Sequence, residues 1–434
     1  MGMTAAEKIL ARASGKASVK PGDVVYPDPE LVFVHDGYIA SSKAQLGELG
    51  IRKVFDENRV VLLTDHIVVY TTAKYVERGK AIRAAAKDWN IKNFFDVGQG
   101  GHGHIFPLER GMILPGSFGF ANDMHCTNFG AVGALVMRSG TEIITVLATG
   151  TMWTEVPKSI RITLTGAFKP GVYMRDFGYR LATNFSSGAF RLDWDYRVLE
   201  FAGDALEKFG VGARVAAINT ATEIGVANVF FPPSEAIIKA ARAIAKRPFE
   251  PVFSDPDAQY EAELLIDLSE LVPQVSLPGN PDNAVDIDTV EGEPINHAYI
   301  GSCGSGMYED MVSAARILQG RKVSPSTRLF IVPGTTDLAR RLVAENLFEV
   351  FQEAGAIVLP AGCGPCAGGN TGPLAPGEVS ICTAATNSTG RFGATDARIY
   401  LGSPATVAAS AVNGRITDPR SFDNLAPSVL GAQP

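Results

Sequence analysis

The sequence predicts an α/β fold with more than one domain. Short apolar stretches, typical of buried strands, alternate with helical segments along most of the chain. A chain of 434 residues is long enough for roughly two or three domains. Apolar residues make up 46% and charged residues 20%, as in an ordinary soluble enzyme. These observations together favour a cytoplasmic α/β enzyme.

Charge and composition argue against several other classes of protein. The formal net charge is −7 and no basic block is present, so we expect no nucleic-acid partner. Five cysteines in so long a chain do not make a disulfide scaffold, and they fit a reducing compartment. Residues 1–20 lack the pattern of a signal peptide. No run reaches the ~20 apolar residues of a membrane span, so we expect no membrane association.

The first third of the chain contains most of the expected strands. Thr4 and Glu7 have the spacing of a capping box, which predicts a helix that begins at Thr4. Periodicity predicts a second helix over residues 75–89. We also expect a helix over 130–137 and a strand over 143–147. Apolar runs bounded by turn residues predict strands over 24–26, 31–34, 59–64 and 94–97.

Acidic and histidine side chains follow several of these segments. Asp65 and His66 end the strand over 59–64, although such a pair is equally common in a surface turn. His102 and His104 lie in a glycine-rich loop that has neither the ending of a phosphate loop nor the spacing of a dinucleotide fingerprint. Two histidines clustered in such a loop favour a site over core packing.

Asp123 and His125 form a second acid–histidine pair. They are two residues apart, which would place them on one face of a strand. Sites in α/β folds lie at the carboxyl ends of parallel strands. Three segments that each supply a histidine therefore suggest a pocket that handles protons or binds a metal.

The middle of the chain contains one candidate acid. Glu223 lies among small and apolar residues, and burial there would raise its pKa and suit it to acid–base catalysis. An exposed helical glutamate is the alternative.

Residues 249–294 are rich in proline and acidic residues, as in a connection between domains. Around this segment we expect a strand over 159–165 and helices over 195–206 and 234–245.

Three cysteines lie in glycine-rich turns of the last third. Cys363 and Cys366 form a C-x-x-C pair after an apolar run, and Cys303 lies in a glycine/serine turn. The pair alone can serve a disulfide, zinc or an iron–sulfur cluster, and Cys303 alone can be a buried turn residue. A closed zinc site needs four ligands. Three thiolates, one of them distant in sequence, suit a [4Fe–4S] cluster that leaves one iron open as a Lewis acid. A zinc or thiol-redox enzyme that uses the pair is the alternative.

These cysteine turns, together with several other stretches, resemble the aconitase superfamily, and most of all the large subunit of 3-isopropylmalate dehydratase. The resemblance covers nearly the whole chain. It rests on residues 6–12, 114–116, 146–150, 153, 156–157, 374–379 and 399–404. It implies an α/β protein with three αβα domains packed around a [4Fe–4S] cluster, over residues 1–158, 159–270 and 271–434. It also implies a hydro-lyase that acts on a small 2-hydroxy di- or tricarboxylic acid or its alkene.

The resemblance also implies roles for individual residues. Cys303, Cys363 and Cys366 match the ligands of the cluster. Asn219 matches an asparagine near the cluster, and Arg391 matches an arginine that holds a substrate carboxylate. Glu223 matches a carboxylate that helps to protonate the leaving hydroxyl group. The active-site acids and histidines of the family match Asp65, His66, His104, Asp123 and His125, with His102 as the alternative to His104.

The chain departs from the family pattern around the expected substrate. Met124 stands where the family usually has serine, and residues 385–391 lack the first of two arginines. Gly304 and Ser305 replace the usual Thr-Asn after the first cysteine. Loss of a charged donor to a carboxylate costs roughly a few kcal/mol of binding. We therefore expect a substrate with an apolar group or fewer carboxylates. A catalytically altered protein with a regulatory or binding role is the alternative.

The resemblance further implies a partner. Members of the superfamily close the site with a smaller swivelling domain that supplies a base, and single-chain members carry it after the third domain. We expect this chain to lack that domain, to bind a separate small subunit and to have little or no activity alone.

Overall fold

The computed structural model describes residues 2–423 and divides the chain into two compact units. The first unit comprises the chain up to residue 163 together with residues 194–203 and 225–265. The second comprises 164–193, 204–224 and the chain from 266 onward. Sheets with parallel strands and covering helices occur in both, which confirms the α/β fold. The expected boundaries of three domains stay a prediction. Among the described helices, none has both the length and the apolar character that crossing a membrane requires.

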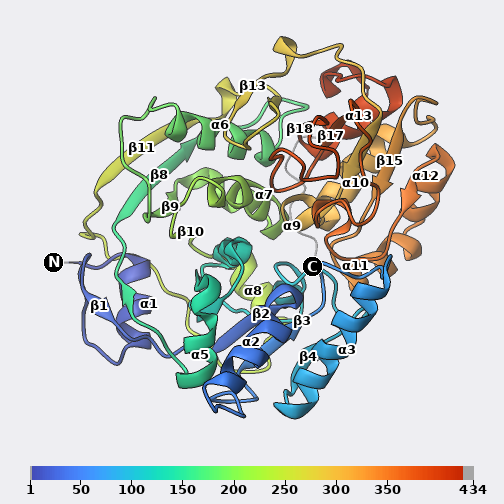
Figure 1. Ribbon diagram of the computed structural model, residues 1–434. Helices are drawn as coiled ribbons and strands as arrows, with labels where there is room; N and C mark the ends of the chain where they lie inside the picture. The colour runs from blue at the N-terminus through green and yellow to red at the C-terminus, as the bar shows by residue number, and fades with distance from the viewer. Residues whose placement is uncertain (1, 424–434) are drawn as a thin grey trace. The chain divides into compact units, whose positions relative to one another are not determined.

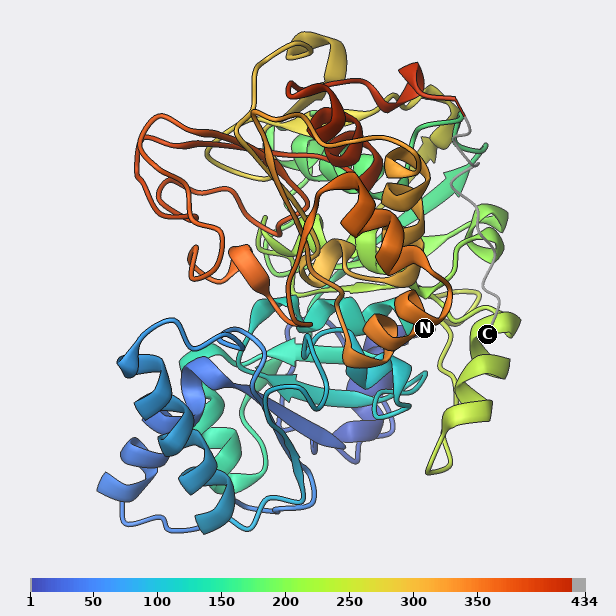
Figure 2. The ribbon, with the colours of Figure 1, turned by 90° about the vertical axis from the view of Figure 1, so that its right-hand side faces the viewer.

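A five-stranded parallel sheet forms the centre of the first unit. Its strand order is β4-β3-β2-β5-β6. The middle strands are buried on both faces, and for that reason they consist of unbroken apolar runs. Two helices, α2 and α3, pack against each other beside this sheet (Figures 1 and 2). The bounds are β2 Leu31–His35, α2 Asp36–Glu48, β3 Val60–Leu63, α3 Ala73–Asp88, β4 Asn93–Phe95, α4 Phe106–Glu109, β5 Phe118–Ala121, β6 Leu135–Arg138 and α5 Ile143–Thr149.

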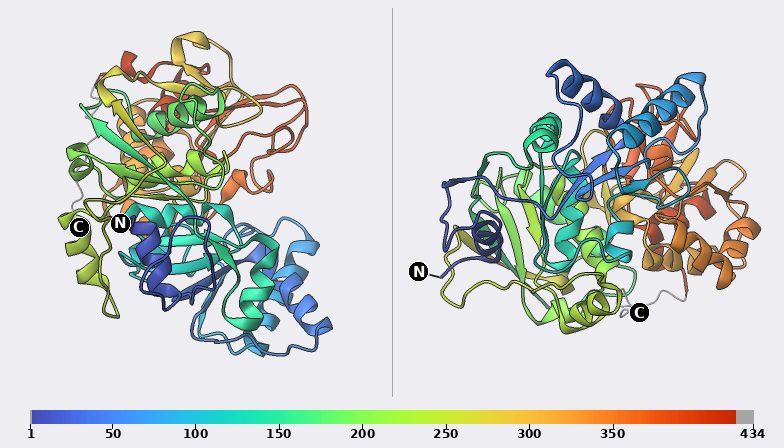
Figure 3. Two further views of the ribbon diagram at one scale, coloured as in Figure 1. Left: turned by 90° about the vertical axis from the view of Figure 1, so that its left-hand side faces the viewer. Right: turned by 90° about the horizontal axis from the view of Figure 1, so that it is seen from below.

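The rest of the first unit contains two smaller sheets. A four-stranded sheet has the order β10-β9-β8-β11, and its green strands lie side by side in the right panel of Figure 3. The capping box at Thr4 is confirmed, because the Thr4 and Glu7 side chains each bond the backbone of the other residue. The bounds are α1 Ala5–Ala13, β1 Val24–Val25, β7 Thr154–Glu155, β8 Ser159–Thr165, β9 Val198–Ala202, β10 Asn228–Phe230, α8 Glu235–Ile244 and β11 Ala262–Asp267.

The second unit is built on a seven-stranded sheet of order β13-β12-β18-β17-β14-β15-β16. The strands from β18 to β16 run parallel, and β12 and β13 continue the sheet in antiparallel pairing. The bounds are α6 Met174–Ser186, α7 Val211–Thr222, β12 Gln274–Ser276, β13 Ala284–Asp286, β14 His297–Ile300, α9 Ser302–Ser305, α10 Tyr308–Leu318, β15 Arg328–Ile331, α11 Thr336–Ala344, α12 Leu347–Ala354, β16 Ile357–Val358, β17 Val379–Cys382, β18 Arg398–Leu401 and α13 Pro404–Asn413.

Three expected elements are wrong in type. Residues 130–137 end a 3₁₀ helix, η1 (Met124–Val132), and then form the buried strand β6. Residues 143–147 begin the helix α5, which Gly150 ends in the left-handed conformation. Residues 195–206 contain the strand β9. In each case a short buried apolar run fits either type of element, so that periodicity cannot decide between them.

Candidate active site

Four neighbouring strands of the first unit end in acids or histidines. His35 ends β2 and Asp36 follows it, Asp65 and His66 follow β3, the loop after β4 carries His102 and His104, and Asp123 and His125 follow β5. These strands are adjacent and parallel, so their carboxyl ends meet at one edge of the sheet. We refer to these eight residues as the histidine cluster. It contains five of the six histidines of the sequence.

Asp65 is the central acceptor of the cluster. Its carboxylate lies 3.0 Å from Nδ1 of His35 and 2.8 Å from Nδ1 of His66. The backbone N–H of Gly103 donates to it at 2.8 Å. Nδ1 of His102 lies 3.6 Å away. Asp65 itself is fully buried, so three loops are tied together by one carboxylate.

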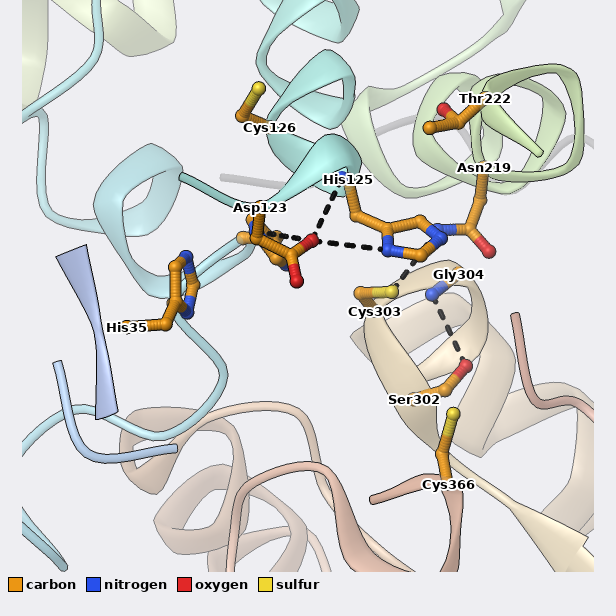
Figure 4. Close-up of polar contacts among 12 residues, drawn as sticks. His35, Asp123, His125, Cys126, Asn219, Thr222, Ser302, Cys303, Gly304 and Cys366 are labelled. Carbon is orange, nitrogen blue, oxygen red and sulfur yellow. Dashed lines mark hydrogen bonds and ion pairs between the residues drawn. The ribbon is translucent and has the colours of Figure 1, made fainter. Parts of the chain in front are cut away.

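Asp123 links the other side of the cluster. Its carboxylate lies 3.4 Å from Nε2 of His104, 3.3 Å from Nδ1 of His125 and 3.8 Å from Nε2 of His66. It also accepts the backbone N–H of His125 at 2.9 Å, a contact drawn in Figure 4. The expected strand at this position is wrong: Asp123 is the N-cap of η1, and this cap rather than a strand face brings Asp123 and His125 together.

The members of the cluster are held in different states of charge. Burial alone would raise the pKa of Asp65, but His35 and His66 hold it well below its usual value. Burial would lower the pKa of His66, but Asp65 and Asp36 hold it well above its usual value. Burial lowers the pKa of His102 to about 4. Burial and the neighbouring His35 together lower the pKa of His104 well below its usual value. Near neutral pH the cluster therefore holds a protonated His66 beside neutral His102 and His104.

Two members of the cluster, His35 and Asp36, were not among the expected site residues. Asp36 accepts the backbone N–H of Ile67 at 3.0 Å and lies 3.2 Å from Nδ1 of His66. The signal for both was present in the sequence, because an acid–histidine pair also ends the preceding strand. The structure places His102 and His104 together in the cluster, with ring centroids 5.2 Å apart.

The second unit gathers the three expected cysteine ligands. Cys303 lies in the short helix α9 directly after β14, and Cys363 and Cys366 lie in the turn after β16, around the 3₁₀ helix η6 (Gly364–Cys366). All three are buried. Besides burial, the nearby Cys366, Cys363, Cys382 and Cys303 raise the pKa of Tyr299, so all four lie near one phenol group. The Tyr299 hydroxyl donates to the Cys363 carbonyl at 2.9 Å.

The backbone around Cys303 is unusual. Ser302 has a φ of 72°, a left-handed conformation that is uncommon for a residue other than glycine. Its hydroxyl donates to the Thr383 carbonyl at 2.7 Å and accepts the backbone N–H of Gly304 at 3.2 Å (Figure 4). Such strain persists only where the surroundings hold it, and it is frequent at functional sites.

Polar side chains of the second unit point their donors at these sulfurs. Asn219, from α7, donates through Nδ2 to the Cys303 Sγ at 3.1 Å. Nη2 of Arg391 lies 3.8 Å from the Cys366 Sγ. The charge on Cys366 raises the pKa of Arg391, to which Cys363 and Glu223 contribute. Three buried thiols, two of which have N–H donors aimed at their sulfurs, fit an iron–sulfur cluster, whose ligand sulfurs are commonly hydrogen-bonded.

The remaining expected residues of the second unit lie near this group. Glu223 is the C-cap of α7 and is only partly buried, so the full burial on which its acid–base role would depend is not observed. Its charge reaches Arg391. A fully buried arginine, Arg175, contacts Asn219 and was not expected, because an arginine in a helix carries no signal of its own.

The other two cysteines are separate from the three ligands. Cys126 lies in η1 of the first unit, where its thiol donates to the Val136 carbonyl at 3.3 Å. Cys382 ends β17, and burial raises its pKa to about 12. All five cysteines are described, and none forms a disulfide.

Comparisons with known proteins show what the chain is similar to. The model of the aconitase family (aconitate hydratase) matches residues 51–414. The chain is 37% identical over 423 residues to 3-isopropylmalate dehydratase large subunit 1 of Methanopyrus kandleri, covering 97% of this chain and 100% of that one. It is also 37% identical over 421 residues to the 3-isopropylmalate dehydratase large subunit of Moorella thermoacetica, covering 96% and 99% of the two chains.

One solved structure shows a similar fold. It is the holo-form of aconitase X from Thermococcus kodakaraensis, with a TM-score of 0.51 and 11% sequence identity. The match covers 85% of this chain and 87% of that one. At this identity the likeness concerns the fold alone.

Proposed function

We propose that the chain is the large subunit of a [4Fe–4S]-dependent hydro-lyase. The premise is that the chain belongs to the aconitase family and is an enzyme of the hydro-lyase class. The family resemblance expected from the sequence is confirmed by the match over residues 51–414. The observation that carries the proposal further is the set of three buried cysteines with N–H donors directed at two of their sulfurs.

The proposed cluster is held by Cys303, Cys363 and Cys366. A cluster with three protein ligands supplies an open iron that acts as a Lewis acid toward a hydroxyl group. Asn219 and Arg391 hold the ligand sulfurs in place through N–H donors. The fixed charge of Arg391 also suits it to bind a substrate carboxylate.

The histidine cluster is proposed to move the protons of the reaction. His66 carries a proton at neutral pH because of Asp65 and Asp36, so it can donate one to a departing hydroxyl group. His104 is neutral and can accept a proton. We assign Asp65, Asp123 and His125 to the same relay, with His102 as the alternative to His104. Glu223 is proposed as a further proton donor.

The proposed substrate is a small 2-hydroxy di- or tricarboxylic acid, or its alkene, that differs from the usual ones of the family. Met124 lies between Asp123 and His125 and is partly exposed, as is Thr386, which stands in the stretch that lacks an arginine. A substrate with an apolar group at this place, or with one carboxylate fewer than the usual substrates, suits these surroundings. A panel of 2-hydroxy diacids and their alkenes tests this. Turnover of 3-isopropylmalate or citrate at a rate normal for the family would contradict it.

The proposed partner is a small subunit that supplies the swivelling domain and a base for the α-proton. Support comes from the relatives, which are named as large subunits and align along nearly the whole chain. The test is to purify the chain anaerobically, alone and with a co-expressed small subunit, and to measure iron, sulfide and turnover. We expect about four irons and sulfides per chain and activity only with the partner. Zinc in place of iron, or full activity of the chain alone, would contradict the proposal.

A second candidate is a catalytically altered protein with a binding or regulatory role. The missing serine and arginine favour it, because both lie where a carboxylate would be held. A cluster-loaded complex that turns over no member of the panel would support this candidate.

A further inference from the structure

Arg175 is a buried arginine whose three guanidinium nitrogens each donate a hydrogen bond. Nε donates to the Tyr179 hydroxyl at 2.9 Å, Nη1 to Oδ1 of Asn219 at 2.9 Å, and Nη2 to the Ala384 carbonyl at 2.8 Å. The residue is 1% exposed. All these partners belong to the second unit. They come from α6, from α7 and from the segment after β17, so one guanidinium ties three parts of the unit together.

Arg175 determines the orientation of the Asn219 amide. A guanidinium only donates hydrogen bonds, so Asn219 must present its oxygen to Arg175. This turns the amide nitrogen toward the Cys303 Sγ, to which it donates at 3.1 Å (Figure 4). Without Arg175 the amide would be free to turn over and to present its oxygen to the sulfur.

Gly304 provides the room for this arrangement. A Cβ on Gly304 would lie well inside van der Waals contact of both Nη1 of Arg175 and Oδ1 of Asn219. A residue with a Cβ at position 304 therefore cannot be accommodated while the Arg175 guanidinium and the Asn219 amide keep these positions.

The charge on Arg175 needs a counter-charge, because a buried unpaired cation is costly. Within residues 2–423 no carboxylate forms an ion pair with it. Asp176 and Asp310 are the acids that its charge reaches, but burial raises their pKa values to about 7 and about 8. Against the effect of burial, the charge of Arg175 also lowers the pKa of Cys382. The Cys303 sulfur is linked to Arg175 through Asn219.

We propose that Arg175 is a positioning residue for the iron–sulfur cluster, which fixes Asn219 as a donor to the Cys303 sulfur and places a buried guanidinium one hydrogen-bonded residue away from that sulfur. This rests on the proposed function, because it requires a cluster at the three cysteines. An N–H donor and a positive charge near the sulfurs stabilise the reduced, more negative cluster. Arg175 therefore raises the reduction potential and slows the loss of iron.

The test compares Arg175→Gln, Arg175→Lys and Gly304→Ala with the wild type, all purified anaerobically with the partner subunit. The reduction potential is measured by titration with electron paramagnetic resonance, and iron release to a chelator is followed over time. We expect a more negative potential in Arg175→Gln and Gly304→Ala, and retention of iron weaker by roughly 10- to 100-fold. Arg175→Lys keeps the charge and is expected to lie between Arg175→Gln and the wild type.

Arg214→Gln is the matched control. Arg214 is also fully buried in the second unit, where it donates to the carbonyls of Leu206 and Phe209. Its loss is expected to lower stability without shifting the potential. If Arg175→Gln fails to fold, the inference is tested by Gly304→Ala. A wild-type reduction potential and wild-type iron retention in that variant would overturn the inference. A wild type that binds no iron would instead overturn the proposed function.

Discussion

His66 and His104 belong to one cluster but are held in opposite states of protonation. Two carboxylates, Asp65 and Asp36, lie within hydrogen-bond reach of His66 and raise its pKa. His104 is buried, and its ring packs 4.3 Å, between centroids, from the ring of His35, so its pKa is lowered. Pairs of groups whose surroundings separate their pKa values are typical of acid–base sites. The proposed proton donor and the proposed proton acceptor are thus distinguished by their neighbours.

The raised pKa of His66 predicts a dependence of stability on pH. The ion pair with Asp65 stabilises the folded chain fully below the unfolded pKa of about 6.5. This stability is lost as the pH rises through the higher folded pKa, with a slope of at most about 1.4 kcal/mol per pH unit. In urea unfolding between pH 6 and 9, we expect His66→Asn to lose this slope. Parallel pH profiles of the variant and the wild type would contradict the assignment.

His35 orients Asp65 and should affect the rate without binding substrate itself. His35→Gln removes the contact between Nδ1 and the Asp65 carboxylate, which lets that carboxylate shift. A displacement of about 1 Å costs roughly 100-fold in kcat. We expect that loss in kcat with little change in KM, measured in the two-subunit complex. His297→Gln is the control, because His297 contacts Ser380 in the other unit. An unchanged kcat in His35→Gln would show that Asp65 is held without it.

The sequence predicted which acids and histidines would lie together, but not the contacts that they make. Asp65, His66, Asp123 and His125 were identified because acids and histidines follow apolar strands. The roles of His35 and Arg175 depend on contacts between residues that are 30 and 44 positions apart. Local patterns carry no information about such pairs, so a structure was needed to find them.

The elements that were misassigned are short and buried. The strand β6 and the helix α5 are both mostly apolar and too short to show periodicity, and in such runs tertiary packing decides the type. The longer helices α3 and α8 were predicted nearly to their ends. Their exposed faces preserve the periodic pattern, which buried elements lose.

The close packing of η1 on β10 predicts the effect of a small substitution. A Cβ on Gly130 would overlap the backbone carbonyl of Val229, which cannot move without moving the strand. We expect Gly130→Ala to destabilise the chain by about 1–3 kcal/mol. Gly47→Ala is the control: it has open space in α2 and should stabilise by about 0.4–1 kcal/mol. Urea unfolding measures both, and equal effects would contradict this packing.

At the scale of the whole molecule, the two units carry different chemistry. The first supplies the histidine cluster from one sheet edge, and the second supplies the cysteines and their donors. Each unit is assembled from three separate stretches of the chain. This interleaving has no signature in composition, which is why the sequence suggested boundaries only in order along the chain.

Iron removal is expected to affect the units unequally. A ligand that binds only the folded state stabilises the structure that holds it. Chelation should therefore abolish turnover and speed hydrogen exchange at residues 301–306 and 361–370. Strands β2 and β3 should keep their protection. Hydrogen exchange with mass spectrometry before and after chelation measures this, and equal loss of protection in both units would contradict cysteine ligation.

Arg175 also has a consequence for the order of folding. Its bonds join residues 44 and 209 positions apart, so they can form only after α6, α7 and the segment after β17 have come together. Contacts that close so late are largely absent from the transition state. We therefore expect these hydrogen bonds to contribute little to the rate of folding and to slow the unfolding of the second unit.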